Sequence, residues 1–241
     1  MKFALVNNEK CEAIQGTKGI CPVCFASVIA KCGDIKIHHW AHKSIKTCDT
    51  WWEQETEWHR QWKDRFPKEY QEVVLFDEQT REKHIADIKT HDGVVFEFQH
   101  SHITSQERES REFFYKNMVW VVDGTRLKRD YQRFQKAFTD GNITQTQLED
   151  CFFVQYPTDC FPQDWISSAV PVFFDFKGLL TIEQQDPFRE PLWCFLPRIK
   201  GKNTYYSNGY KVTNWKRDML ISVQRELLVT SYQQLLKKIN E

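Results

Sequence analysis

The sequence lacks a long apolar run, an excess of charge of either sign, and any low-complexity tract. No stretch approaches the roughly 20 apolar residues that a membrane-spanning helix needs, and the first ten residues show no apolar core of a secretory signal. Lys and Arg number 33, as do Asp and Glu, which argues against a strongly basic nucleic-acid coat protein. Hydrophobic residues make up 41% of the chain and aromatic residues 15%, enough for a folded core. We therefore expect a folded cytoplasmic protein.

Charge is unevenly distributed along the chain. Residues 1–50 carry 7 basic and 4 acidic side chains, residues 51–150 carry 15 and 20, and residues 151–241 carry 11 and 9. An acidic middle segment thus lies between two mildly basic ones. Because charge can be concentrated locally, the neutral composition does not exclude a nucleic-acid site.

Cysteines are concentrated near the start of the chain, where five of the eight lie within the first 50 residues. Thiols stay reduced in the cytosol, so this crowding indicates metal binding before disulfides. Cys21 and Cys24 form a Cys-x-x-Cys pair, and His39-Trp-Ala-His42 follows after fourteen residues. We expect a strand and a turn near Gly33 to bring these histidines back to the cysteines. The four side chains would then bind Zn²⁺.

Alternatives to this ligand set stay open. The two histidines are closer together than in a usual zinc finger, so the last two ligands have further candidates: Cys32, His38 and Cys48. A second interpretation treats Cys21 and Cys24 as ordinary core residues.

A tryptophan-rich helix is predicted for residues 50–66. Its aromatic side chains recur at helical spacing and form one apolar face: Trp51, Trp58, Trp62 and Phe66. A second stripe carries Glu55, His59 and Lys63, spaced i, i+4 and i+8. From spacing alone, such a stripe is more often a solvated, salt-bridged face than a site.

Two strands are predicted at residues 84–89 and 93–99, because the Asp-Gly dipeptide between them favours a hairpin with a primed turn. A second helix follows, with Thr104 as N-cap and Glu107 at position N3. A continuous apolar run at residues 118–123 predicts a buried strand. The order of these elements is helix, strand, strand, helix, strand.

Carboxylates of the predicted hairpin are expected to meet. Period-two alternation puts Glu97 and Gln99 on one face of the second strand, and Phe96 and Phe98 on the other. Asp87 lies on the neighbouring strand. Two acids held together repel each other unless a cation lies between them. Mg²⁺ or Mn²⁺, which takes oxygen ligands, is the natural choice.

Two further features complete the pattern. One face of the second helix carries Arg108, Arg111 and Tyr115, a row suited to contacting nucleic-acid phosphates. Residues 151–241 show short strand patterns and, from about Thr213 to Ile239, a helical repeat of apolar residues. We expect an α+β region there.

The motifs together resemble one known family. They occur in this order: Glu55-Thr-Glu-x-His59-x-x-x-Lys63, Ala86-Asp87, Glu97-x-Gln99-x-Ser101 and Arg111-x-x-x-Tyr115. Combined with the Cys-x-x-Cys and His-Trp-Ala-His segments, they resemble the competence protein CoiA family over roughly residues 1–125. That family belongs to the PD-(D/E)XK, or restriction-endonuclease-like, nuclease superfamily.

The resemblance implies an α/β fold in which a restriction-endonuclease-like mixed sheet is flanked by helices. Together with these patterns it predicts three domains: a small zinc-ribbon-like module at residues 1–50, a nuclease core at 51–150 and an α+β region at 151–241. The implied function is a Mg²⁺-dependent deoxyribonuclease that hydrolyses phosphodiester bonds in single- or double-stranded DNA. It would serve competence, recombination or phage defence, with other DNA-processing or defence proteins as partners.

The resemblance also implies roles for individual residues. Asp87 and Glu97 would bind Mg²⁺ or Mn²⁺, together with the backbone carbonyl of Phe98. Glu55 would complete the site from the helix, and Glu57 is the alternative acid.

Three further residues would assist. His59 and Lys63 would support the site or contact phosphate, and Gln99 stands where the superfamily commonly has a lysine. Gln99 would position the attacking water, but it cannot supply a positive charge. This substitution motivates a second hypothesis, a catalytically inactive zinc-containing DNA-binding or assembly protein that keeps the nuclease scaffold.

Overall fold

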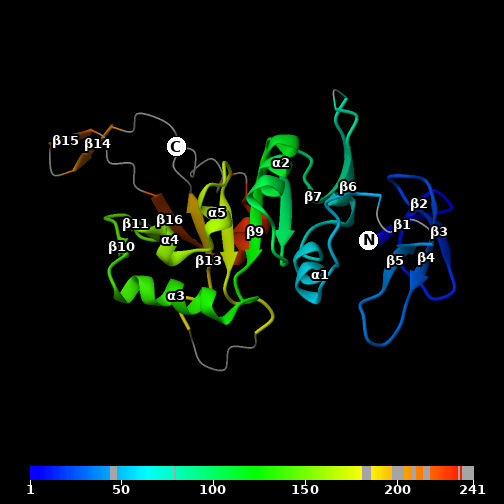
Figure 1. Ribbon diagram of the computed structural model, residues 1–241, viewed down its shortest axis with the longest axis horizontal. Helices are drawn as coiled ribbons and strands as arrows, with labels where there is room; N and C mark the ends of the chain where they lie inside the picture. The colour runs from blue at the N-terminus through cyan, green and yellow to red at the C-terminus, as the bar shows by residue number, and fades with distance from the viewer. Residues whose placement is uncertain are drawn as a thin grey trace. The chain divides into compact units, whose positions relative to one another are not determined.

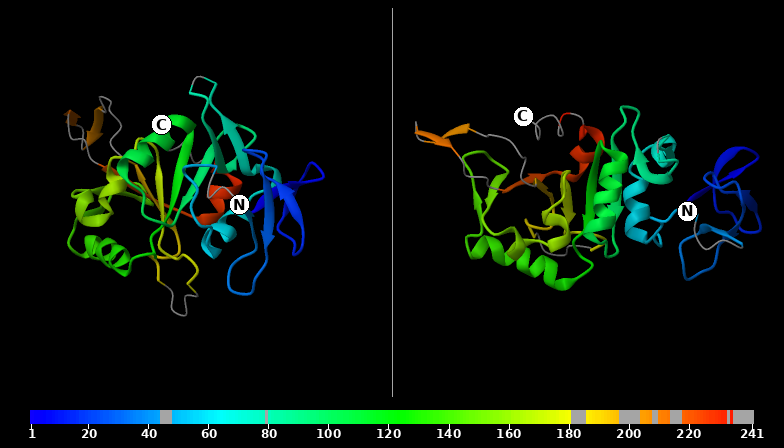
Figure 2. Two further views of the ribbon diagram at one scale, coloured as in Figure 1. Left: turned by 45° about the vertical axis from the view of Figure 1, so that its right-hand side comes forward. Right: turned by 45° about the horizontal axis from the view of Figure 1, so that its top comes forward.

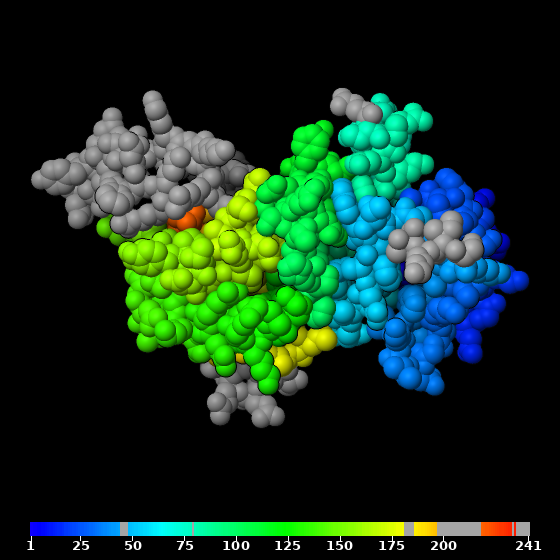
Figure 3. Space-filling view, in the orientation of Figure 1, coloured from blue at the N-terminus to red at the C-terminus, as the bar shows by residue number. Residues whose placement is uncertain are grey.

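A computed structural model describes most of the chain (Figures 1 and 2). The described residues are 1–43, 48–78, 80–180, 186–196, 204–207, 210–213, 218–232 and 234, and Figure 3 shows their surface on one face. The fold is mixed α/β and divides into two compact units, residues 1–101 and 102–241. The expected domain boundaries at residues 50 and 150 fall inside these units. Within the described residues, no helix is both long and apolar enough to cross a membrane.

Unit 1 begins with a five-stranded antiparallel sheet in the order β2-β1-β3-β4-β5. Its strands are β1 (Phe3–Val6), β2 (Glu9–Glu12), β3 (Lys18–Ile20), β4 (Ser27–Lys31) and β5 (His39–His42). Asn7 and Asn8 join the first two strands with φ of 52° and 65°, the left-handed pair that a type I′ turn requires. A Cβ on Gly19 would lie 3.1 Å from the Ala4 Cβ and 3.2 Å from the Trp40 ring. Glycine therefore lets β3 pack closely in this small core.

The rest of unit 1 is a helix packed on an antiparallel sheet in which β7 lies between β6 and β8. The elements are α1 (Glu57–Lys63), the 3₁₀ turn η1 (Lys68–Tyr70), β6 (Gln71–Phe76), β7 (Lys83–Lys89) and β8 (Val95–Gln99). The Trp62 ring stacks on Phe98 with centroids 5.7 Å apart, and the Phe66 ring lies 5.2 Å from Phe96. The predicted apolar face of the helix and the predicted inward face of β8 therefore meet.

Helix α1 begins at Glu57, seven residues later than residue 50 where the periodicity placed its start. Thr56 is the N-cap: its side chain accepts from the His59 N–H, and the Thr56 N–H donates to the His59 Nδ1. This reciprocal cap supplies hydrogen bonds to the first turn, so the helix begins directly after Thr56. Trp51 consequently lies outside the helix and stacks on His84, with ring centroids 3.3 Å apart.

The hairpin between β7 and β8 is confirmed, but its turn differs from the primed turn expected. The Thr90 N–H donates to the Val94 carbonyl at 3.0 Å, which leaves three residues in the loop. Gly93 alone takes a left-handed φ, at 85°, whereas a type I′ turn needs two such residues.

Unit 2 contains a sheet in the order β10-β11-β16-β13-β12-β9, in which β9 and β12 are parallel and the other pairs antiparallel. The strands of this sheet are β9 (Met118–Asp123), β10 (Ile143–Gln145), β11 (Cys151–Val154), β12 (Val172–Asp175), β13 (Leu192–Leu196) and β16 (Asp218–Val223). A separate hairpin consists of β14 (Thr204–Ser207) and β15 (Tyr210–Thr213). The helices of unit 2 are α2 (Ser105–Tyr115), α3 (Lys128–Thr139), α4 (Pro157–Cys160), α5 (Gln163–Ile166) and α6 (Arg225–Thr230). The predicted Thr104 cap and the buried strand β9 are confirmed.

The long C-terminal helix predicted from about Thr213 is wrong for the described residues. Asp218–Val223 is a strand, because it pairs on one side with β11 and on the other with β13. Leu220 is fully buried there. Among the described residues of this segment, helix begins at Arg225, and residues 214–217, 233 and 235–239 of the predicted helix lie outside the described part of the chain.

Candidate metal centre and carboxylate cluster

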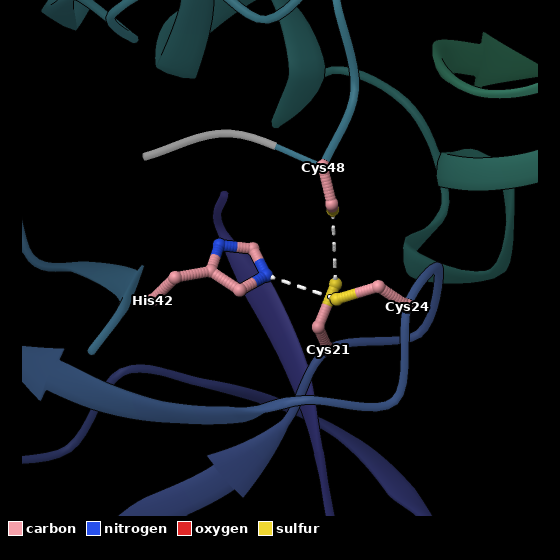
Figure 4. Close-up of side chains that lie close together, drawn as sticks. All are labelled: Cys21, Cys24, His42 and Cys48. Carbon is pink, nitrogen blue, oxygen red and sulfur yellow. Dashed lines mark hydrogen bonds between the residues drawn. The ribbon is translucent and has the colours of Figure 1, made fainter. Parts of the chain in front are cut away.

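Four side chains of unit 1 converge to form a Cys₃His cluster (Figure 4): Cys21, Cys24, His42 and Cys48. Their ligand atoms all lie within 4.8 Å of one another. The Sγ atoms of Cys21 and Cys48 are 3.5 Å apart, and the Cys24 Sγ lies 3.3 Å from the His42 Nε2. Three thiols and one imidazole are a ligand set that Zn²⁺ accepts in tetrahedral structural sites. The cluster could therefore bind zinc.

A tight loop positions the cysteine pair. The Cys21 N–H donates to the Ala26 carbonyl at 2.9 Å, and the Phe25 N–H donates to the Cys21 carbonyl at 3.0 Å. Phe25 closes the loop with a left-handed φ of 60°. The Val23 N–H lies 3.4 Å from the Cys21 Sγ, so a backbone donor points at the sulfur.

Strand β5 decides which histidine joins the cluster. β4 pairs antiparallel with β5, as expected, but His39 and His42 are three residues apart on one strand and face opposite sides of the sheet. The His42 ring faces Cys24, whereas the His39 Nδ1 lies 2.9 Å from the Ile37 carbonyl. The structure therefore brings Cys48, not His39, to the other three ligands, which corrects the predicted ligand set.

Electrostatics in the cluster suit metal binding. Burial opposes ionisation of Cys24, but the Ala26 N–H and the neighbouring thiols offset it and hold the pKa of Cys24 below its ordinary value. Burial and the two neighbouring cysteines raise the pKa of Cys48. Burial also lowers the pKa of His42 and so favours the neutral imidazole that a metal needs. A metal cation would offset the negative charge of these thiols once they ionise.

The second arrangement is a carboxylate cluster centred on a lysine: Glu55, Glu72, Asp87 and Glu97 with Lys63. The Lys63 Nζ lies 2.5 Å from Glu55 Oε1, 3.0 Å from Glu72 Oε1 and 3.6 Å from Asp87 Oδ1. Burial lowers the Lys63 pKa, but these carboxylates outweigh it and raise the pKa above its ordinary value. Because the Lys63 side chain is only 4% exposed, the solvated-face interpretation of this stripe is wrong.

Glu72 was not identified from the sequence. Glu72 lies on β6 and has a left-handed φ of 45°. Its carboxylate accepts hydrogen bonds from Lys63 and from the backbone N–H groups of Lys2 and Phe3, the latter two at 2.8 and 2.9 Å. Burial raises the pKa of Glu72, but Lys63, the chain's amino terminus and these backbone donors bring it down to about 2. No periodic pattern marked this residue, because its partners come from a strand some 70 positions away in the sequence.

Asp87 and Glu97 lie together across β7 and β8, as predicted. In the antiparallel ladder, Lys89 pairs with Val95, and Ile88 pairs with Phe96. One residue farther along, the Asp87 N–H donates to the Glu97 Oε1 at 3.1 Å. The Phe98 N–H donates to the Asp87 Oδ2 at 3.0 Å. The two carboxylates thus replace ladder hydrogen bonds and are held against their neighbouring strands.

Burial gives Asp87 and Glu97 an unusual setting. Burial raises the pKa of Asp87 above its ordinary value, although Lys63, His59 and the Phe98 N–H act in the opposite direction. Glu97 is only 4% exposed. A buried carboxylate such as Glu97 is unfavourable unless cations or hydrogen bonds compensate it.

Glu53 is a second residue that sequence reasoning missed. Its Oε1 accepts from the His59 Nε2 at 2.7 Å, and its Oε2 accepts from the Gln99 Nε2 at 3.1 Å and from the Ser101 hydroxyl. The Thr56 N–H lies 3.2 Å from the His59 Nδ1, so Thr56 and Glu53 hold the two ring nitrogens of His59. Glu53 therefore joins two of the predicted site residues, His59 and Gln99.

The remaining predicted residues fall elsewhere. Glu55 precedes α1 instead of lying on it, yet still reaches Lys63, while Glu57 is exposed. In unit 2, Arg108 is fully buried and donates to Glu112 at 2.7 Å, so it does not face solvent as a phosphate contact would. Arg111 pairs with Glu107 at 2.5 Å, one turn earlier in the same helix. Tyr115 is 8% exposed.

Comparison with known proteins bears on the first of these arrangements. Neither the curated proteins nor the solved structures gave a match to this chain. Residues 4–50 match the family model described as "Competence protein CoiA, N-terminal domain". The matched segment includes the strands and all four members of the Cys₃His cluster. Over this segment the chain is similar to the N-terminal domain of competence protein CoiA.

Proposed function

We propose that the chain is a divalent-metal-dependent nuclease that hydrolyses phosphodiester bonds in DNA, in a role related to competence. The observation that carries this proposal is the pair of Asp87 and Glu97, locked together across β7 and β8 by backbone hydrogen bonds. The elements α1, β7, β8, α2 and β9 follow the order predicted from the sequence, with β6 as an additional strand after α1. The match of residues 4–50 to the CoiA N-terminal domain supports the competence-related role.

The residues fit a hard divalent cation such as Mg²⁺ or Mn²⁺. The donors are two carboxylates and, on the same strand face, the Gln99 Oε1, which is buried and has no hydrogen-bond partner among the described residues. Oxygen atoms of these kinds are the ligands that such ions take. Asp87, Glu97 and the Phe98 carbonyl would hold the ion, which supplies Lewis-acid polarisation of the scissile phosphate. Lys63 places a positive charge beside Asp87.

The test is cleavage of labelled single- and double-stranded DNA by the full chain with Mg²⁺ or Mn²⁺. Asp87→Ala and Glu97→Ala should each abolish cleavage while the circular dichroism spectrum is unchanged. Glu82→Ala removes an exposed acid just before β7 and is the matched control, which should cleave like the wild type. Equal cleavage by both site variants and the control would contradict the assignment.

A second candidate function is a catalytically inactive zinc-containing protein that binds DNA or an assembly partner. Two observations favour it. Lys63 already supplies a cation to three carboxylates. In addition, the Cys₃His cluster is the one group of three or more metal-ligating side chains that the described residues bring within mutual reach. DNA binding without cleavage in either metal would favour this candidate.

A further inference from the structure

The amide of Gln99 is held in one orientation by groups that can only accept hydrogen bonds. Its Nε2 lies 3.1 Å from the Glu53 Oε2 and 3.2 Å from the Ser101 backbone carbonyl. A carboxylate and a carbonyl have no proton to give, so both must face the NH₂ group. The two N–H bonds of the amide are thereby used, and the Ser101 Oγ at 3.1 Å lies on the same side.

The other end of the same amide has no partner. The Gln99 Oε1 is buried, on a residue that is only 2% exposed, and none of the described residues donates a hydrogen bond to it. Leaving a buried carbonyl oxygen without a hydrogen bond is energetically unfavourable. Gln99 follows Glu97 by two positions on β8, so their side chains leave the strand on the same face. The unsatisfied oxygen is therefore on the side of the strand that carries the carboxylate pair.

We propose that the Gln99 Oε1 is a direct ligand of the divalent cation held by Asp87 and Glu97. This inference rests on the proposed function. In this position Gln99 is not a neutral replacement for a lysine that donates to water or phosphate, because its donors are occupied by Glu53 and Ser101. The positive charge of such a lysine comes instead from α1, where Lys63 lies 3.6 Å from Asp87 Oδ1.

Glu53 is the positioning residue for this ligand. Its two oxygens accept from His59 and Gln99, and His59 is itself held by Thr56 at the start of α1. A glutamine at position 53 could donate a hydrogen bond to Gln99 as well as accept one. The Gln99 amide could then flip, so that its oxygen and nitrogen exchange places. Glu53→Gln should therefore weaken cation binding although Glu53 does not contact the cation.

The experiment is calorimetric titration of the zinc-loaded full chain with Mn²⁺, without DNA. Wild type should bind Mn²⁺, and Asp87→Ala should not. Gln99→Leu and Gln99→Asn, which remove the oxygen or shorten its reach, should each weaken binding by about tenfold or more. Gln99→Lys should weaken it most, because it adds a positive charge. Gln61→Leu changes an exposed glutamine on α1 and should bind like the wild type.

The outcomes separate the two proposals. If wild type binds Mn²⁺ through Asp87, but the Gln99 variants bind it with wild-type affinity, the ligand assignment is overturned and the carboxylate site stands. If wild type and Asp87→Ala do not differ, both proposals fail. Circular dichroism and zinc content establish that each variant is folded, and Gln99→Asn keeps the test valid if Gln99→Leu does not fold.

Discussion

The Cys₃His cluster and the carboxylate cluster differ in how the negative charge of their ionisable groups is compensated. Both gather side chains that become negative when they ionise, in a partly buried setting. In the carboxylate cluster, the protein supplies the compensating cation itself, because Lys63 reaches Glu55, Glu72 and Asp87. In the Cys₃His cluster, burial and the neighbouring cysteines raise the pKa of Cys48, and the compensating cation would be a metal.

This difference indicates which site depends on metal for its structure. Thiolates and a neutral imidazole bind zinc tightly, and a closed four-ligand site contributes folding free energy. The carboxylates are already compensated in large part, so a divalent ion there would serve chemistry more than folding. The following predictions, from the largest expected effect to the smallest, test that contrast.

Loss of the Cys₃His metal should have the largest effect. Cys48→Ser should lose bound zinc and lower the free energy of unfolding of unit 1 by on the order of 5 kcal/mol or more. Cys11→Ser, outside the cluster, is the control. His42→Ala should lose zinc and His39→Ala should keep it, as measured by elemental analysis and thermal unfolding. Zinc loss in His39→Ala alone would contradict the assigned ligands.

Removal of the internal cation should have the next largest effect. Lys63→Met leaves buried carboxylates uncompensated and should cost about 3–5 kcal/mol in chemical unfolding. Lys18→Met, at an exposed position on β3, should cost less than about 0.5 kcal/mol. Added Mg²⁺ should stabilise Lys63→Met more than the wild type, because the ion can replace the lost charge. A cost equal to that of the control would show that Lys63 does not hold the cluster together.

Glu72 should make the stability of the protein sensitive to acid. Its folded-state pKa of about 2 lies below the ordinary value of 4.5, so its contribution is complete above pH 4.5 and is lost as the pH falls toward 2. The linked stabilisation is about 3 kcal/mol. Glu72→Gln should remove this pH dependence between pH 4.5 and 2.5 in urea unfolding. Glu69→Gln, at an exposed position, should retain it.

Asp87 should show the smallest stability effect, with the opposite sign. Burial raises its folded-state pKa, so its ionised form is disfavoured by folding as the pH rises above the ordinary value. Asp87→Asn at pH 7 should therefore leave stability unchanged or raise it by about 1 kcal/mol. The same variant should lose Mn²⁺ binding. Strong destabilisation would show that Asp87 serves the fold and not a cation.

Local patterns in the sequence predicted much of unit 1. The hairpin of β7 and β8, its inward phenylalanines and the Asp87–Glu97 pair all follow from alternation and one turn. His39 was misassigned because a spacing of three suits a helix but separates two side chains on a strand. The predicted start of α1 is too early, because the helical spacing of aromatic residues continues on the N-terminal side of the Thr56 cap, where the helix begins.

By itself, the sequence determined the features that depend on neighbours along the chain: the cysteine pair, the strand alternation, the Thr104 cap and the aromatic face of α1. Tertiary structure alone decided which distant groups meet. Cys48 completes the Cys₃His cluster, Glu72 binds the backbone of Lys2 and Phe3, and Glu53 orients Gln99. The physical reason is that burial, charge compensation and the direction of a hydrogen bond depend on packing between segments, which no local pattern records.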